Sequence, residues 1–325
     1  TGGSVTLASG VSATGTSGSI DLFSANGAEA SGSINLATGA SAASDTGSMS
    51  ITTGVSKSTK SGGLVMSTGD SVQKSGDIEI SGGTSSSIGG SIKLAGGVGG
   101  VLGGSIILSA GTSPGSGKSG SVAIYSGSTK EGEGGAFNVA AGYSEFATGG
   151  SVEILSGSSS ASGSGAVNVL TANSVGYGPS GTIKVASGTA SLSNTGAVIL
   201  ETGNSTVGHA GNIMMRAGVS AIDDGAELFL RAGDTSSIAA SGGMVSVRAG
   251  DGTNPDAAAG GKGGDVSIQA GAAFGTASGD KGGALELNAG DSTNGKGGSI
   301  GLTTGFSASG SSGNIEMVTN NAGVS

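Results

Sequence analysis

The amino-acid sequence predicts an all-β fold, a single-stack β-solenoid of 21 rungs of about 15 residues each, forming an elongated rod. Three observations predict it: a short cassette recurs along the chain, its apolar residues lie two positions apart, and glycine closes it at both ends. Gly89–Gly97, which reads Gly-Gly-Ser-Ile-Lys-Leu-Ala-Gly-Gly, is the clearest copy. One such unit cannot bury its own apolar face, so copies are expected to stack.

The period of the repeat follows from the first apolar residue of each cassette. These residues are Val5, Ile20, Ile34, Met49, Leu64, Ile78, Ile92, Ile106, Val122, Phe137, Val152, Val167, Ile183, Val198, Ile213, Leu228, Val245, Val266, Leu285, Ile300 and Ile315. Positions 5 to 315 span 20 intervals with a mean of 15.5 residues. The two longest intervals, around residues 251–264 and 272–283, predict insertions in the loop part of the repeat.

Each cassette is predicted to be a strand because a spacing of two is the strand period. Ile92 and Leu94 share one face, and Lys93 points to the other. Glycine pairs are expected at the corners, where positive φ or close backbone approach is needed. The small residue two positions after the second apolar residue suits a narrow lumen. Residues one repeat apart, such as Ile78, Ile92 and Ile106, are then expected to stack in aliphatic columns.

The composition limits the class of protein. There is no cysteine, and a net charge of −9 argues against a phosphate-binding surface and hence against nucleic acid. No apolar run is long enough for a membrane span. The repeat predicts one domain, residues 1–325. Because the chain starts at Thr1 without Met and ends at Ser325 within a repeat, with no polar cap, we expect a piece of a longer chain or filament.

Catalytic and ligand-binding residues are sparse. The lone histidine, His209, lies at a predicted exposed corner, so no enzyme activity is expected. In the longest loop, Asp251, Asn254 and Asp256 offer oxygen ligands of the kind that calcium prefers, but solvated turn residues are the general alternative. We adopt the second interpretation. The sequence therefore predicts no catalytic residue, no metal site and no cofactor.

Two columns of outward residues indicate a lateral contact surface. Ile199, Met214 and Phe229 form the first, and Glu201, Arg216, Arg231 and Arg248 form the second. An apolar strip beside stacked arginines is typical of a contact surface. Stacked like charges need counter-ions, which Asp234 and Asp251, three residues after their arginines, can supply. A self-neutralised ladder of ion pairs is the alternative interpretation.

The pattern Gly-Gly-Ser-Val-x-Leu-x-Ser-Gly, with spacers such as residues 156–163, resembles a group of known proteins. These are the Gly/Ser-rich tandem-repeat β-solenoid proteins of extracellular or surface fibres in algae, related protists, phages and bacteria. The resemblance implies extracellular, structural or adhesive use. Asn204 begins an Asn-Ser-Thr sequon, which predicts N-glycosylation.

The first functional hypothesis is a structural building block of an extracellular or cell-surface filament that self-associates end to end or laterally. An ice-binding solenoid is the second, but it needs a regular grid of outward threonines, and outward pairs such as Thr6/Ala8 and Lys93/Ala95 are irregular. The third is an adhesive module that binds anionic glycans through Arg216, Arg231 and Arg248.

Overall fold

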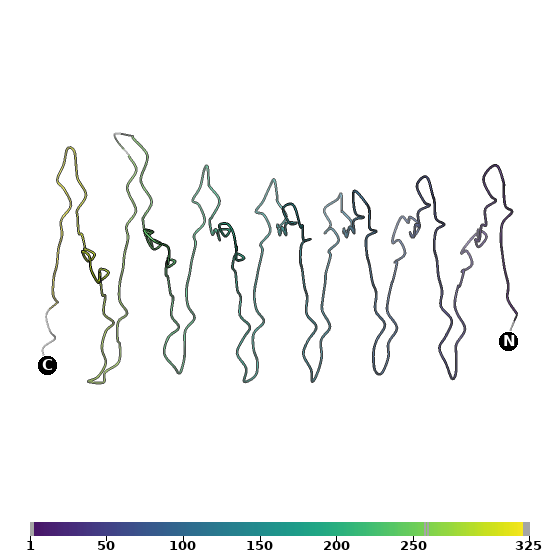
Figure 1. Ribbon diagram of the computed structural model, residues 1–325, viewed down its shortest axis with the longest axis horizontal. Coiled ribbons are helices and arrows are strands. Elements are labelled where there is room, and N and C mark those ends of the chain that lie inside the picture. Colours follow the sequence, from purple (N-terminus) through teal and green to yellow (C-terminus); the bar gives the residue numbers. More distant parts are fainter. Residues whose placement is uncertain (1–2, 257, 259, 321–325) are drawn as a thin grey trace. The chain divides into compact units, whose positions relative to one another are not determined.

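The computed structural model describes residues 3–256, 258 and 260–320. This part of the chain contains no helix and no β-strand, only bends and turns joined by irregular backbone (Figure 1). The prediction of an all-β, single-stack β-solenoid is therefore wrong. The chain divides into two compact units, Thr1–Leu155 and Ser156–Ser325.

Within each unit the chain alternates between loops and connecting segments. A typical loop has a glycine at each end, and a backbone hydrogen bond joins the two. The Gly104 amide donates to the Gly97 carbonyl at 2.8 Å in the first unit, and the Gly243 amide donates to the Gly233 carbonyl at 2.9 Å in the second. We call this glycine pair the neck of the loop. The sequence between two loops, such as residues 105–110, is a connecting segment.

Close approach of backbone explains why the neck needs glycine. A Cβ on Gly104 would lie 2.8 Å from the backbone nitrogen of Gly97, closer than real Cβ atoms come. Positive φ plays no part, because no described glycine has it; Ala239, at φ 58°, is the one described non-glycine residue that does. The predicted corners are thus confirmed as glycine positions, and the physical requirement is space.

The small residue two positions after the second apolar residue also lies at the neck. Ala232 shows this, because a Cβ on Gly243 would lie 3.2 Å from the Ala232 Cβ. A larger side chain at either position would push the two sides of the loop apart. The expectation that these small residues line a narrow lumen is wrong: they lie where the loop closes.

Hydroxyl side chains hold the tips of the loops. The Ser12 Oγ accepts a hydrogen bond from the Gly15 amide at 2.9 Å, and the Ser307 Oγ accepts one from the Gly310 amide at 2.9 Å. Serine and threonine commonly replace a backbone acceptor in this way at turns. Since the pattern recurs along the chain, it gives a structural reason for the Ser/Thr-rich spacers.

Exposure along the connecting segments alternates with the predicted period of two. In one segment Ile106 is 52% exposed, Ile107 is 84% exposed and Leu108 is 69% exposed. The two members of the apolar pair therefore share the more shielded face. The assignment of faces from the sequence is confirmed, although no β-strand forms.

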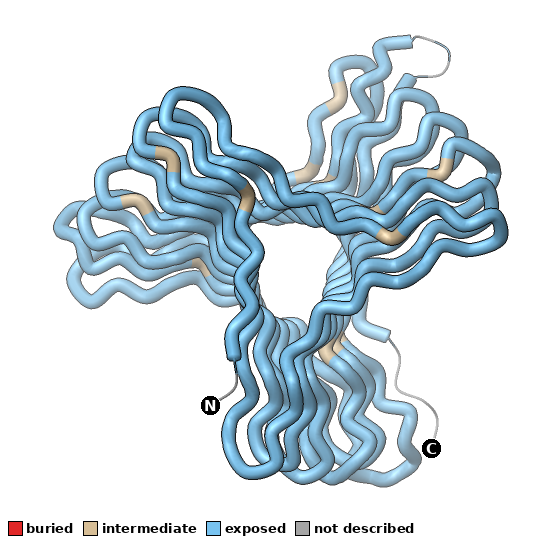
Figure 2. Tube along the Cα trace, turned by 90° about the vertical axis from the view of Figure 1, so that its right-hand side faces the viewer, coloured by how far each residue is buried: buried red, intermediate tan, exposed pale blue. Residues whose placement is uncertain are grey.

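Successive repeats do not stack within one chain. Within each unit the loops point in three directions (Figure 2), and the sequence colours of Figure 1 show that successive loops take these directions in turn. Across the described residues, backbone hydrogen bonds close necks and tight turns. The bond with the largest separation in sequence joins the Gly264 amide to the Gly250 carbonyl. No such bond joins the segments that carry Ile78, Ile92 and Ile106. The prediction that these residues stack within one chain is wrong, because each repeat turns away from the one before it.

The described part of the chain has no core. None of its residues, apolar or polar, is buried (Figure 2). The chain exposes 32,180 Å². A folded monomer of this mass would expose about 12,000 Å² and an unfolded chain about 43,000 Å². The conformation therefore lies much closer to an unfolded chain in exposed surface than to a folded monomer.

Candidate contact surfaces

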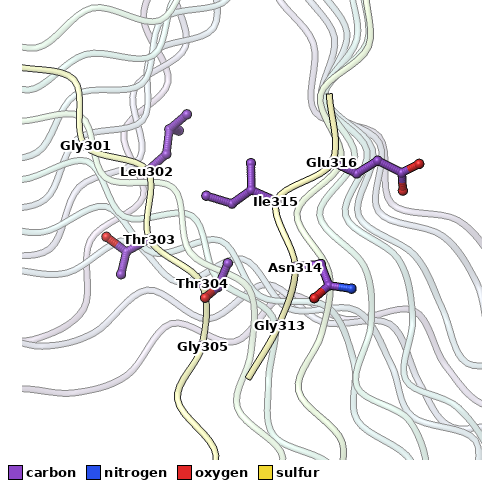
Figure 3. Close-up of a pocket in the computed structure, with 9 residues that line it drawn as sticks. All are labelled: Gly301, Leu302, Thr303, Thr304, Gly305, Gly313, Asn314, Ile315 and Glu316. Carbon is purple, nitrogen blue, oxygen red and sulfur yellow. The ribbon is translucent and has the colours of Figure 1, made fainter. Parts of the chain in front are cut away.

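The space beside one neck shows how the apolar pairs are presented. Two connecting segments leave the neck formed by Gly305 and Gly313 and diverge around an open cleft of about 580 Å³. Leu302 and Ile315 point into this space from opposite sides, whereas Thr303 and Glu316 point away (Figure 3). The alternation of faces therefore gathers apolar side chains inside the cleft and polar ones outside it.

The chemistry of the cleft suits an apolar side chain. Its inward side chains are Leu302, Ile315 and the short hydroxyl-bearing Thr304 (Figure 3). The carboxylate of Glu316 is directed to the opposite side of its segment. An apolar side chain from another molecule would cover Leu302 and Ile315 without displacing a charged group.

The predicted apolar column remains exposed. Ile199, Met214 and Phe229 are 74%, 81% and 76% exposed. They lie on three successive connecting segments, and among the described residues no backbone hydrogen bond joins these segments to one another. Each copy of the chain thus presents them as separate apolar side chains open to contact.

The arginine column divides into paired and unpaired members. Arg231 donates to Asp234 at 2.5 Å, and Arg248 donates to Asp251 at 2.6 Å. Both pairs join residues three apart, as the spacing predicted, and all four side chains are largely exposed. Exposed pairs of this kind typically stabilise a fold by about 0–1 kcal/mol. Their main effect is to neutralise the two arginines.

Arg216 differs because the residue three positions later is Val219 rather than aspartate. Among the ion pairs of the described residues, neither Arg216 nor Glu201, one repeat earlier, takes part. Glu79 and Lys93, also one repeat apart, are likewise outside these pairs. The third ion pair joins Lys74 to Asp77 at 3.8 Å.

The other predicted positions lie in loops. Asn204 and His209 are exposed, and the neighbouring Ser205 Oγ accepts a hydrogen bond from the Gly208 amide at 3.0 Å. The sequon is therefore displayed on a turn, and the predicted exposure of His209 is confirmed.

The acidic residues of the longest loop act as turn residues. The Asn254 side-chain oxygen accepts a hydrogen bond from the Asp256 amide at 3.1 Å, while Asp251 pairs with Arg248. Within residues 3–256, 258 and 260–320, no group of three or more His, Cys, Asp or Glu side chains is placed to hold a metal ion. The predicted loop insertions are confirmed: the Gly264 and Gly283 amides donate to the Gly250 and Gly271 carbonyls and close the long loops.

Two features of these surfaces were missed by sequence reasoning. The first is the set of hydroxyls that hold the loop tips, for which a serine or threonine three residues before glycine, as in Ser292-Thr-Asn-Gly295, was an available signal. The second is the cleft between Leu302 and Ile315. No local pattern gives it, because it depends on the direction in which each segment leaves the neck.

A comparison with known proteins finds no matching family, no matching characterised protein and no matching solved structure. The resemblance to fibre repeats therefore rests on the sequence pattern alone. A search of the described residues for a helix long and apolar enough to cross a membrane finds none.

Proposed function

We propose that this chain is a structural subunit of an extracellular filament or appendage, built by association of copies of the chain. The observation that carries the proposal is that none of the repeated apolar pairs in the described residues is buried. Ile92 and Ile106, for example, are each about half exposed, and no described apolar side chain is buried. Exposed apolar surface on this scale is typical of a protein that is completed by partners.

Energetics supports association over a monomeric function. Fixing the backbone costs about 1–2 kcal/mol per residue. In the isolated chain the opposing terms are small, because no described side chain is buried and the described backbone hydrogen bonds join only nearby residues. Regular partners along the whole chain would supply both the burial of apolar side chains and the backbone hydrogen bonds between segments. A repeat that presents the same apolar pair 21 times is suited to such continuous contact.

An extracellular location is part of the same proposal. Its support is the exposed sequon at Asn204 and the resemblance of the repeat to proteins of surface fibres. Mass spectrometry of the protein isolated from its natural source would test this part. A glycan on Asn204 would support an exported protein, and a cytosolic protein without a glycan on Asn204 would contradict it.

Negative-stain electron microscopy of the purified chain tests the filament. We expect elongated particles that lengthen or bundle as the protein concentration rises. A population of compact particles, with the mass of one chain at every concentration, would contradict the proposal. The glycan-binding alternative is less well supported, because Asp234 and Asp251 neutralise two of the three arginines on which it depends.

A further inference from the structure

We infer that the partner of each chain is two further copies of itself, interlaced around a common threefold axis. In this arrangement the connecting segments of the other two copies lie between successive turns of the first. The inference deepens the proposed function by naming the partner and its register. It rests on that proposal only for association of the chain with itself, not for growth into filaments.

The number of copies follows from symmetry. Within each unit successive loops point in three directions in turn (Figures 1 and 2), so three repeats make one turn. Rotating a second copy by one third of a turn places each of its loops in the direction of a loop of the first. Rotation by half a turn would place the loops of a second copy between those of the first. Closed cyclic symmetry is the usual arrangement of homo-oligomers, and threefold symmetry brings like segments together here.

The interlaced arrangement gives hydrogen-bond partners to the backbone amides and carbonyls of the connecting segments, and it covers their exposed surface. Among the described residues, no backbone hydrogen bond joins one connecting segment to another, although proteins form about one internal hydrogen bond per residue. Connecting segments of neighbouring copies that point in the same direction can form these backbone hydrogen bonds with one another. The exposed surface of 32,180 Å², nearly three times the area of a folded monomer of about 12,000 Å², is then covered by identical chains.

The register between copies follows from the same geometry. In a given direction, the segment next to one repeat belongs to a neighbouring copy and is the repeat before or after it. Residues one repeat apart, which do not meet within a chain, therefore become neighbours between chains. The apolar side chains of Ile199, Met214 and Phe229, each from a different copy, would then form one continuous strip.

Charge complementarity supports this register. Glu79 and Lys93 occupy equivalent positions one repeat apart, and so do Glu201 and Arg216. None of the four takes part in an ion pair among the described residues. Between interlaced copies, Glu79 would face Lys93 and Glu201 would face Arg216. Opposite charges on facing segments favour this pairing over one that is shifted by a repeat.

Disulfide trapping tests both copy number and register, and the absence of native cysteine makes the test clean. Ser81 and Ala95 are small, exposed and one repeat apart, so Ser81→Cys with Ala95→Cys places one thiol on each of two facing segments. A thiol oxidant such as diamide takes two electrons and two protons from each thiol pair. We expect a closed trimer on a non-reducing denaturing gel, at about 90 kDa, three times the 29.9 kDa of one chain. Reduction should return it to one chain.

The matched control is Ser81→Cys with Ser109→Cys, two repeats apart, because disulfides require Cα atoms within about 7 Å. It should stay at the mass of one chain. For the Ser81/Ala95 pair, a crosslink within one chain, a band limited to two chains or an open ladder of bands would overturn the inference.

A second measurement uses the unmodified sequence and does not depend on the variants. Tagged and untagged full-length chains are denatured together, refolded and analysed by native mass spectrometry. Three interlaced copies give four species, whereas two copies give three and a monomer gives two. A closed trimer that never lengthens in electron micrographs would retain this inference and reject the filament. Filaments without the trimer crosslink would retain the filament and overturn the interlaced trimer.

Discussion

Ile106 and Ile107 provide a matched test of the interlaced assembly, because they are adjacent isoleucines on opposite faces of one connecting segment. Ile106 is 52% exposed and belongs to the apolar pair, whereas Ile107 is 84% exposed and points to the other face. Replacing a fully buried isoleucine by alanine costs about 2–5 kcal/mol. Since about half of Ile106 remains to be covered on assembly, Ile106→Ala should cost about 1–2 kcal/mol per copy.

Three copies carry the change in each assembly, so the loss totals about 3–6 kcal/mol. For three chains in equilibrium with one assembly, the concentration at half-dissociation varies as the square root of the dissociation constant. That concentration should rise about 10- to 150-fold for Ile106→Ala. Light scattering coupled to size-exclusion chromatography over a dilution series measures it.

Ile107→Ala is the control and should change the same concentration by less than about threefold, because most surface changes are small. The reasoning would be refuted by equal effects of the two substitutions. It would also be refuted by an unchanged dissociation concentration for Ile106→Ala.

Three further predictions concern the loops and the charged surface. Gly104→Ala should lower the melting temperature of the assembled protein, because its Cβ would clash with the Gly97 nitrogen at a cost of about 1–3 kcal/mol. The control Gly103→Ala, whose Cβ would lie 3.9 Å from the Gly97 carbonyl oxygen, should leave the melting temperature unchanged. Equal melting temperatures of the two variants would contradict the role of the neck. Ser205→Ala should speed hydrogen exchange of the Gly208 amide by about 2- to 10-fold without changing the mass of the assembly, since one hydrogen bond contributes about 0.5–1.5 kcal/mol. Arg248→Ala should change stability to chemical denaturation by less than about 1 kcal/mol, and a larger loss would show that its exposed pair with Asp251 does more than neutralise charge.

The sequence by itself determined which residues share a face and where the chain turns back. The spacing of Ile106 and Leu108 predicts the shielded face, and the neck glycines and long loops lie where the repeat predicts them. The aspartates three residues after Arg231 and Arg248 likewise predict both ion pairs. These features are local, because they depend on groups within one loop or one segment.

The tertiary structure alone decided which segment lies next to which. A repeat makes every segment chemically similar to every other, so the apolar pair at Ile92 fits equally well beside its own chain or another copy. Periodicity therefore favoured stacking of Ile78, Ile92 and Ile106 within one chain, which the structure contradicts. The direction in which each segment leaves its neck settles the choice, because it turns successive repeats apart and leaves their backbone groups and apolar faces without a partner in the same chain.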